Sequence, residues 1–176
     1  MSVSREDEKN KIILDADYAG IPGASSFKVV DNEVYLGMLK ELIEEGRDVP
    51  LTVTGGSMTP FVIHKRDSVV LSPVRGSLKR GDVVMYQREG GMYVLHRIVK
   101  VCRDGTYVLC GDAQTVKEPG VRRDQIFARV ISIKRKGKIK KPGSFFWFFF
   151  SKIWSRLIPF RRRILKASGR LKAQSG

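Results

Sequence analysis

The chain has 176 residues, of which 42% are hydrophobic, and this is ordinary for a soluble fold with one core-forming domain and added segments. Its formal net charge is +15. Residues 1–124 contain equal numbers of basic and acidic residues, 18 of each, whereas residues 125–176 contain 15 Lys and Arg residues and no Asp or Glu. This distribution predicts an anionic partner for the C-terminal part and not for the neutral part that precedes it.

The N-terminal part is predicted to contain an extension, residues 1–30, and one helix, residues 31–46. Residues 1–25 are charged and lack the long apolar core of a signal peptide or membrane span. Asp31 can cap the helix and Gly46 can end it. The helix is expected to pack on a sheet, with contact to a partner as the alternative, through apolar residues at helical spacing: Val34, Tyr35, Met38, Leu39, Leu42 and Ile43.

A glycine turn at residues 55–60, Gly-Gly-Ser-Met-Thr-Pro, follows an alternating strand pattern. The glycines can adopt positive φ and turn the chain, which leaves the Ser57 hydroxyl uncrowded. Pro60 fixes its own φ and disfavours helix at Thr59. Ser57 is therefore a candidate nucleophile, and the N–H groups of the turn can face an oxyanion. A solvated serine in an ordinary glycine turn is the alternative.

A serine hydroxyl needs a base, and the chain has two histidines. His96 lies in a strand pattern, Met92 to Val99, where it shares one face with Val94 and Ile98. It is the candidate base, and a half-buried histidine bonded to backbone is the alternative. His64 lies in a polar turn and is expected at the surface.

A third group should orient the imidazole, and two acids fall in the loop after the next hairpin. Asp112 follows a glycine and Glu118 precedes a proline, so either can be an ordinary turn carboxylate. Within the hairpin itself, Asp104-Gly105 predicts a two-residue turn that pairs Cys102 with Tyr107 and Cys110 with Val99. The two sulfurs would then lie on opposite faces without forming a disulfide. The cysteine spacing lacks a second ligand pair, so no metal or other cofactor is predicted.

Several short motifs occur in an order that resembles the signal peptidase I and SOS-repressor protease superfamily. The resemblance covers about residues 50–134 and rests on five stretches: Gly56 to Pro60, Lys79 to Val84, His96 to Val99, Gly111-Asp112 and Ile126 to Val130. It implies a mainly β fold of short antiparallel strands. The Lys79 to Val84 stretch is expected to be a turn that begins a strand.

Within that superfamily the chain looks closest to the archaeal and endoplasmic-reticulum branch, because His96 occupies the place where bacterial signal peptidases have a lysine. The resemblance implies Ser57 as nucleophile and His96 as general base and acid. Asp112 matches the Gly-Asp of the family and is the preferred orienting acid. Glu118 is its rival, since the acid of this branch can lie a few residues downstream.

The C-terminal tail, residues 136–176, is basic and rich in aromatic residues. Phe145 to Phe160 is too short for a membrane span, and it contains two charged residues, Lys152 and Arg156. A membrane-surface anchor is therefore predicted over Phe145 to Lys172. Packing of the aromatic residues on the core of the protein is the alternative, and nucleic acid binding is disfavoured because the aromatic block is not interleaved with basic residues.

These features predict a mainly β serine endopeptidase with one N-terminal helix and a C-terminal amphipathic segment. Its peptidase domain is expected at residues 31–135, with the catalytic β block at 50–134. The predicted substrate is a peptide or protein, and the predicted location is the cytoplasmic face of a membrane. Whether it cleaves secretory signal peptides stays open, because nothing obvious would carry the domain across a membrane. A non-catalytic membrane-associated binding module and a self-cleaving regulator are the alternatives.

Overall fold

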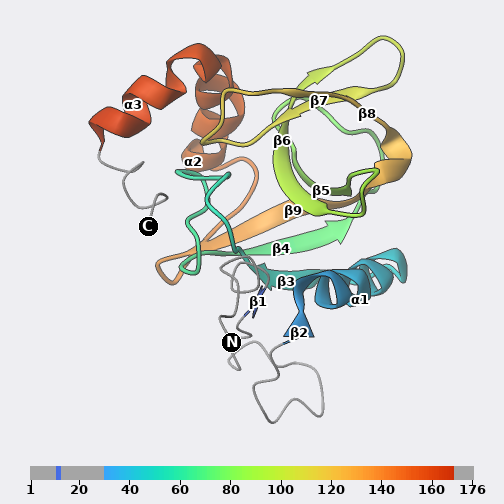
Figure 1. Ribbon diagram of the computed structural model, residues 1–176. Helices are drawn as coiled ribbons and strands as arrows, with labels where there is room; N and C mark the ends of the chain where they lie inside the picture. The colour runs from blue at the N-terminus through green and yellow to red at the C-terminus, as the bar shows by residue number, and fades with distance from the viewer. Residues whose placement is uncertain (1–10, 13–29, 169–176) are drawn as a thin grey trace, which may run out of the picture.

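A computed structural model describes residues 11–12 and 30–168, and side chains from residue 34 onward. Most of the predicted N-terminal extension therefore lies outside the described residues. Its two described pieces, β1 (Lys11–Ile12) and β2 (Val30–Asp31), pair antiparallel. The helix α1 (Asn32–Glu44) follows immediately and packs on one face of a large sheet (Figure 1).

The large sheet has eight antiparallel strands, in agreement with the predicted mainly β fold. Their order is β3-β4-β9-β5-β6-β7-β8, and β10 pairs with β9. The bounds are β3 (Val49–Thr52), β4 (Ser68–Pro73), β5 (Val83–Gln87), β6 (Tyr93–Val101), β7 (Tyr107–Cys110), β8 (Glu118–Val121), β9 (Ile126–Arg135) and β10 (Lys138–Lys140), with a 3₁₀ turn at Arg123–Gln125. Strands β5 to β8 curl over in Figure 1, whereas β3 and β4 extend away from them.

Two apolar clusters lie on opposite faces of the curled strands. The larger one joins α1, β3, β4 and β9 to the C-terminal segment, and the smaller one fills the space between β5, β6, β7 and β8. Strand β6 contributes to both, because Leu95 packs against the larger cluster and Val94 and Ile98 belong to the smaller one. This alternation is the one that the sequence predicts for residues 92–99.

Helix α1 confirms the predicted helix, within two residues at its C-terminal end. Gly46 has a φ of 95° and its N–H donates to the carbonyl of Ile43, so the glycine ends the helix as expected. The predicted apolar stripe is wrong at two positions. Val34 and Met38 are more than half exposed, and Leu36 is buried in their place.

The hairpin between β6 and β7 differs from the predicted one. Cys102 donates its N–H to the carbonyl of Thr106, and Tyr107 pairs with Val101 instead of Cys102. The turn is therefore one residue longer than the two-residue turn, with Gly105 at a φ of 84°. A register shift further along pairs Cys110 with Arg97 instead of Val99. Both cysteines are free thiols.

The C-terminal segment, residues 144–168, folds against the sheet. It consists of α2 (Phe145–Phe148), a π-helical turn (Phe149–Ile153), 3₁₀ turns at Trp154–Arg156 and Ile158–Phe160, and α3 (Arg161–Ala167). Its side chains Trp147, Phe150, Trp154 and Leu165 are buried in the larger cluster. For Trp147, Phe150 and Trp154, the structure therefore agrees with the alternative that aromatic residues of the tail pack on the core. The tail begins inside the β9–β10 hairpin, so it continues directly from the sheet.

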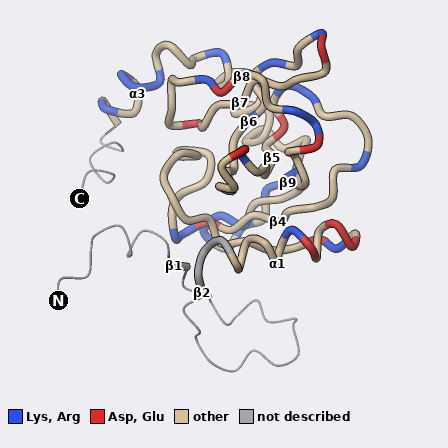
Figure 2. Tube along the Cα trace, turned by 45° about the vertical axis from the view of Figure 1, so that its right-hand side comes forward, with Lys and Arg blue, Asp and Glu red and all other residues tan. Residues whose placement is uncertain are grey.

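Other apolar side chains of this segment face outward: Phe145, Phe148, Ile153, Phe160 and Ile164. None of the helices in the described ranges is both long and apolar enough to cross a membrane. Figure 2 shows Lys and Arg residues but no acidic residues along the C-terminal segment, whereas α1 carries both kinds.

Candidate active site

Ser57 lies in a compact turn between β3 and β4. Gly55 has the positive φ, 92°, that the sequence predicts, and its N–H donates to His64 Nδ1 at 2.8 Å. The Thr59 N–H closes the turn on the carbonyl of Gly56 at 3.1 Å. His64 is exposed, as expected, but it also holds the glycine turn in place. The Ser57 side chain is half-buried, and its hydroxyl makes no hydrogen bond to any residue that the structure describes.

The turn of Ser57 contacts the loop that follows β7. The Ala113 N–H donates to the Ser57 carbonyl oxygen at 2.8 Å. Gly111 lies so close that a Cβ atom there would be 2.7 Å from the same oxygen and 2.8 Å from Gln114 Oε1. Only glycine fits this approach, because a contact of that length with a backbone atom forces the two loops apart. The Gly-Asp motif therefore has a steric basis at Gly111.

His96 projects from β6 on the face of the smaller cluster and is only 3% exposed. Its Nδ1 lies 3.4 Å from the hydroxyl of Tyr86 on the neighbouring strand β5. Burial lowers the pKa of His96 from 6.5 to about 4, although the nearby Glu118 carboxylate acts in the opposite direction. The imidazole is thus neutral near pH 7, as a general base must be. No hydrogen bond between His96 and Ser57 is present among the described side chains.

Glu118, at the start of β8, is connected to His96 through Tyr86. The Tyr86 hydroxyl donates to Glu118 Oε2 at 2.6 Å, and Arg88 donates to both carboxylate oxygens at 2.9 and 2.7 Å. Burial opposes ionisation of Glu118, but the hydrogen bonds from Arg88 and Tyr86 outweigh it and lower the pKa of the carboxyl group. The phenol pKa of Tyr86 is raised, first by burial and then by Glu118. Tyr86 therefore stays protonated between the carboxylate and the imidazole.

Asp112 is fully buried in a different arrangement. Arg97 donates to its two carboxylate oxygens, with Nε at 3.0 Å and Nη2 at 2.6 Å, and Arg161 Nη2 lies 3.6 Å away. The Arg97 guanidinium also lies over the Phe61 ring, with its Cζ atom 4.3 Å from the ring centroid. In the described structure Asp112 makes no hydrogen bond to His96. Since Arg97 and His96 are adjacent in β6, they project to opposite faces, and Asp112 is on the side of Arg97.

The C-terminal segment holds the loop that carries Asp112. Trp154 Nε1 donates to the Asp112 carbonyl at 2.9 Å, and Arg161 Nη1 donates to the Gly111 carbonyl at 2.8 Å. Arg161 is completely buried there. Gly81, in the Lys79 to Val84 turn, contacts the same segment, since a Cβ on it would be 2.8 Å from the Cβ of Ser151. That turn begins β5, as predicted.

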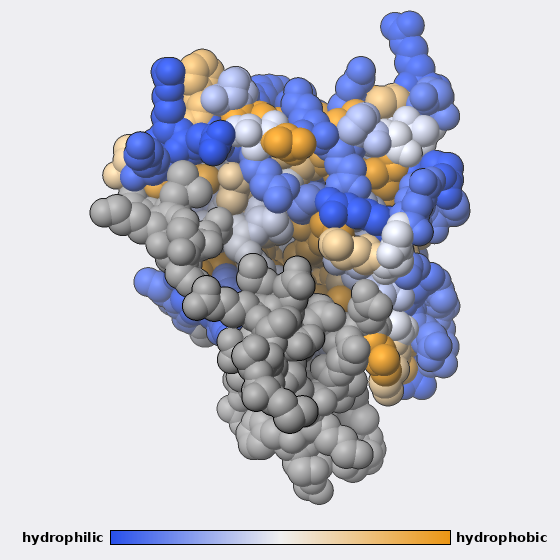
Figure 3. All heavy atoms as spheres, viewed as in Figure 1, coloured by the Kyte–Doolittle hydropathy of each residue, from blue (hydrophilic) through white to orange (hydrophobic). Residues whose placement is uncertain are grey.

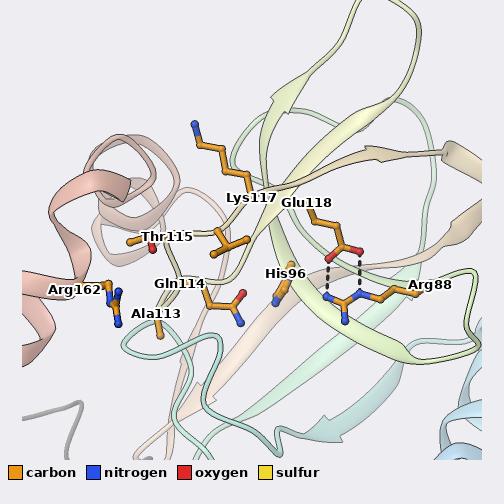
Figure 4. Close-up of a pocket in the computed structure, with 9 residues that line it drawn as sticks. Arg88, His96, Ala113, Gln114, Thr115, Lys117, Glu118 and Arg162 are labelled. Carbon is orange, nitrogen blue, oxygen red and sulfur yellow. Dashed lines mark hydrogen bonds and ion pairs between the residues drawn. The ribbon is translucent and has the colours of Figure 1, made fainter.

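A pocket of about 420 Å³ opens beside His96. Arg88, His96, residues 113–118 and Arg162 line it (Figure 4). The loop that binds the Ser57 carbonyl, at Ala113, is therefore also a wall of the pocket. This loop is the structural link between the two predicted catalytic side chains. The pocket falls within the usual size range of ligand-binding cavities.

Sequence reasoning missed four of the residues around these groups: Tyr86, Arg88, Arg97 and Arg161. Tyr86 carried a partial signal, because it lies in the strand that precedes the His96 strand and shares a hairpin with it. Arg161 carried none, since nothing distinguishes it from the two arginines that follow. The residues that the structure describes contain no cluster of three His, Cys, Asp or Glu side chains able to hold a metal ion.

The family model described as Peptidase S24-like matches residues 18–131. This range includes the Ser57 turn, His96, Asp112 and Glu118, and it ends before the C-terminal segment. No curated protein matches the chain.

Proposed function

This chain belongs to the peptidase S24-like family of serine peptidases, and from that premise we propose an endopeptidase with Ser57 as nucleophile and His96 as general base. The observation that carries the proposal is the hydrogen bond from Ala113 to the Ser57 carbonyl, because Ala113 also lines the pocket of His96. Within the wider signal peptidase superfamily, a histidine base is the feature that favours the archaeal and endoplasmic-reticulum branch.

The hydrogen bonds of Tyr86 favour one tautomer of His96. Tyr86 has a single hydroxyl proton and donates it to Glu118, so its oxygen is left to accept from His96 Nδ1–H. The Nε2 atom is then unprotonated and free to act as the base. In this proposal Glu118 is the orienting carboxylate, and it acts through Tyr86. Asp112, the preferred acid on sequence grounds, instead holds the loop through Arg97 and Arg161.

The proposed reaction is acyl transfer to Ser57. His96 Nε2 removes the Ser57 proton as Oγ attacks the substrate carbonyl carbon, and the imidazolium returns that proton to the leaving amine. Water then attacks the acyl-enzyme with His96 again as base. The N–H groups of Ser57 and Met58 make no hydrogen bonds within the described structure, so they can stabilise the oxyanion. Each such donor contributes roughly 3 kcal/mol in known hydrolases.

A serine-reactive acylating probe tests this function on the full-length protein. The probe should form an adduct on the peptide containing Ser57, and Ser57→Ala should abolish it. His96→Ala should slow labelling by roughly 10²-fold to 10⁴-fold. Ser77→Ala is the matched control, because Ser77 is an exposed serine that does not line the pocket beside His96. Labelling that survives Ser57→Ala, or that is unchanged in His96→Ala, would reject the mechanism.

One observation favours a second candidate, a non-catalytic binding module with a peptidase-like fold. In the described structure Ser57 and His96 are not hydrogen-bonded to each other, although catalytic hydrogen bonds often form only when substrate is bound. The labelling experiment separates the two functions. An intact mass that falls on prolonged incubation would instead favour a self-cleaving regulator.

We also propose that the protein works at a membrane surface, on the cytoplasmic face. The support is the outward-facing apolar side chains of the C-terminal segment, among them Phe145 and Phe148, beside the exposed cations Lys152 and Arg156. Figure 3 shows hydrophobic and hydrophilic side chains side by side at the upper left, where Figure 1, drawn from the same side, has the C-terminal helices. Such a surface suits the headgroup region of an anionic leaflet.

A further inference from the structure

The pocket beside His96 carries an excess of positive charge. Three cationic side chains line it, and only Arg88 has an acidic partner, Glu118, which it binds through two hydrogen bonds. Lys117 and Arg162 form no ion pair with any residue in the described part of the chain. The Lys117 side chain points away from His96 and Arg162 in Figure 4, so Arg162 provides the uncompensated positive charge on its side of the pocket.

Arg162 is positioned by the residue before it. Arg161 is buried and donates to the carbonyl oxygens of Gly111 and Gln114, at 2.8 and 3.3 Å, which fixes the first turn of α3. Successive residues of a helix point about 100° apart, so the three arginines in a row have different surroundings. Arg161 enters the core, Arg162 lines the pocket beside His96, and Arg163 is exposed and does not line that pocket.

Arg162 and the Arg88–Glu118 pair lie on opposite sides of His96. In Figure 4 Arg162 comes from the C-terminal segment, with Ala113 and Gln114 between it and the histidine. A peptide group held at His96 would thus have the Arg162 guanidinium on one side, near the loop that contacts Ser57. On its other side it would have the Arg88–Glu118 ion pair, whose charges neutralise each other. Guanidinium groups bind carboxylates through two parallel N–H donors, which makes them selective for planar anions.

We propose that this pocket binds a carboxylate of the peptide substrate, with Arg162 as its ligand. The enzyme would then select substrates with a carboxylate next to the scissile bond. The inference deepens the proposed function and rests on it for the cleavage step. It also gives the C-terminal segment, which lies beyond the residues matched by the family, a role in specificity.

Cleavage of a peptide library by the full-length protein tests the selection. Asp or Glu near the cleaved bond should raise kcat/KM roughly tenfold over Asn or Gln, a fold-change typical of one charge-assisted hydrogen bond. Peptides with a free or an amidated C-terminus distinguish a side-chain carboxylate from a terminal one. Arg162→Gln should remove most of the preference, and Arg162→Glu should shift it toward Lys-containing peptides.

Arg163→Gln is the matched control, because it removes the same charge from the same helix outside the pocket. It should keep the wild-type preference. Equal cleavage of acidic and amide peptides by the wild-type protein would overturn the inference. So would a preference that Arg162→Gln leaves unchanged, because Arg162 would then not be the ligand. A preference that Arg163→Gln removes equally would also overturn it, because the effect would then come from net charge.

Binding to the Ser57→Ala variant separates this inference from the proposed function. Fluorescence anisotropy with labelled acidic peptides and their amide counterparts reports the pocket without turnover. Tighter binding of the acidic peptide, lost in Ser57→Ala/Arg162→Gln, would support the carboxylate site even if the wild-type protein cleaves nothing. Equal binding of the two peptides would overturn the site even if the serine is labelled as proposed.

Discussion

Gly111 and Ser57 approach each other so closely that a Cβ atom on the glycine would be 2.7 Å from the serine carbonyl oxygen. Gly111→Ala should therefore push the Ser57 turn away from the loop that lines the His96 pocket. We expect kcat to fall at least tenfold, because small displacements of reacting groups are costly. Gly90→Ala is the control, since a Cβ at Gly90 meets no atom within 4 Å. Equal kcat in the two variants would contradict the proposed dependence on this contact.

The chain of hydrogen bonds from Glu118 through Tyr86 to His96 leads to a second prediction. Tyr86→Phe removes the acceptor for His96 Nδ1, and Glu118→Gln removes the charge that stabilises the imidazolium. Both variants should lower kcat, by roughly tenfold or more, with a smaller change in KM. Steady-state kinetics on a cleaved peptide measure this split.

Asp112→Asn provides the contrast between the two candidate acids. Asp112 forms a fully buried ion pair with Arg97, and removing one partner of such a pair typically costs about 3–5 kcal/mol. We therefore expect a lower unfolding temperature from Asp112→Asn, whereas Glu118→Gln acts mainly on turnover. A stable Asp112→Asn protein with kcat reduced as far as in Glu118→Gln would restore Asp112 as the orienting acid.

The His96 pKa of about 4 predicts how activity depends on pH. A general base must be unprotonated, so the acidic limb of the kcat/KM profile should lie near pH 4 and not near 6.5. Activity should persist at pH 5.5, where an ordinary histidine would be mostly protonated. A limb centred near pH 6.5 would show that His96 is not buried as described or is not the base.

The same shift predicts a change in stability. Between pH 6.5 and about 4 the unfolded chain protonates His96 while the folded protein does not, so the unfolding free energy should fall as the pH is lowered through this window. The loss from His96 alone is on the order of 3 kcal/mol. Denaturant unfolding of the wild-type protein and of His96→Gln at several pH values isolates the contribution of His96, because the variant has no imidazole to titrate at this position.

Local sequence patterns predicted the parts of the fold that depend on neighbouring residues. The end of α1 at Gly46, the alternation along β6 and the glycine turn before Ser57 each follow from backbone preferences of a few residues. The predicted β6–β7 register was wrong, because the turn contains one residue more than the two-residue turn that Asp104-Gly105 indicates. Asp104 Oδ1 accepts from the Thr106 N–H and hydroxyl, which stabilises this longer turn.

The surroundings of the candidate site could not be predicted in this way, because they join residues far apart in the sequence. Arg161 meets Gly111 across 50 positions, and Tyr86 meets Glu118 across 32. No local pattern encodes such contacts. The choice between Asp112 and Glu118 depended on which face of the sheet each acid reaches, and only the three-dimensional path of the loop after β7 determines that.

The C-terminal segment should be required for activity, because it holds the loop of the candidate site. Arg161→Ala removes the bond to the Gly111 carbonyl and leaves Asp112 with one cation instead of two. We expect kcat to fall and the unfolding temperature to drop, with partial rescue by Arg161→Lys, which restores the charge but not the planar donors. Arg156→Ala is the control, since Arg156 is exposed and bonds only within its own segment. Full activity in Arg161→Ala would show that the loop holds its position without the segment.

The exposed aromatic side chains of the same segment predict binding to anionic vesicles. Phe145 and Phe148 are 80% and 52% exposed, so Phe145→Ser/Phe148→Ser should leave the unfolding temperature nearly unchanged. Co-sedimentation with vesicles containing phosphatidylserine should nevertheless weaken, because the apolar contribution to membrane binding is lost. High salt should weaken binding of both proteins, since Lys152 and Arg156 contribute through charge. Co-sedimentation of the double variant equal to wild type would mean that these side chains do not enter the bilayer surface.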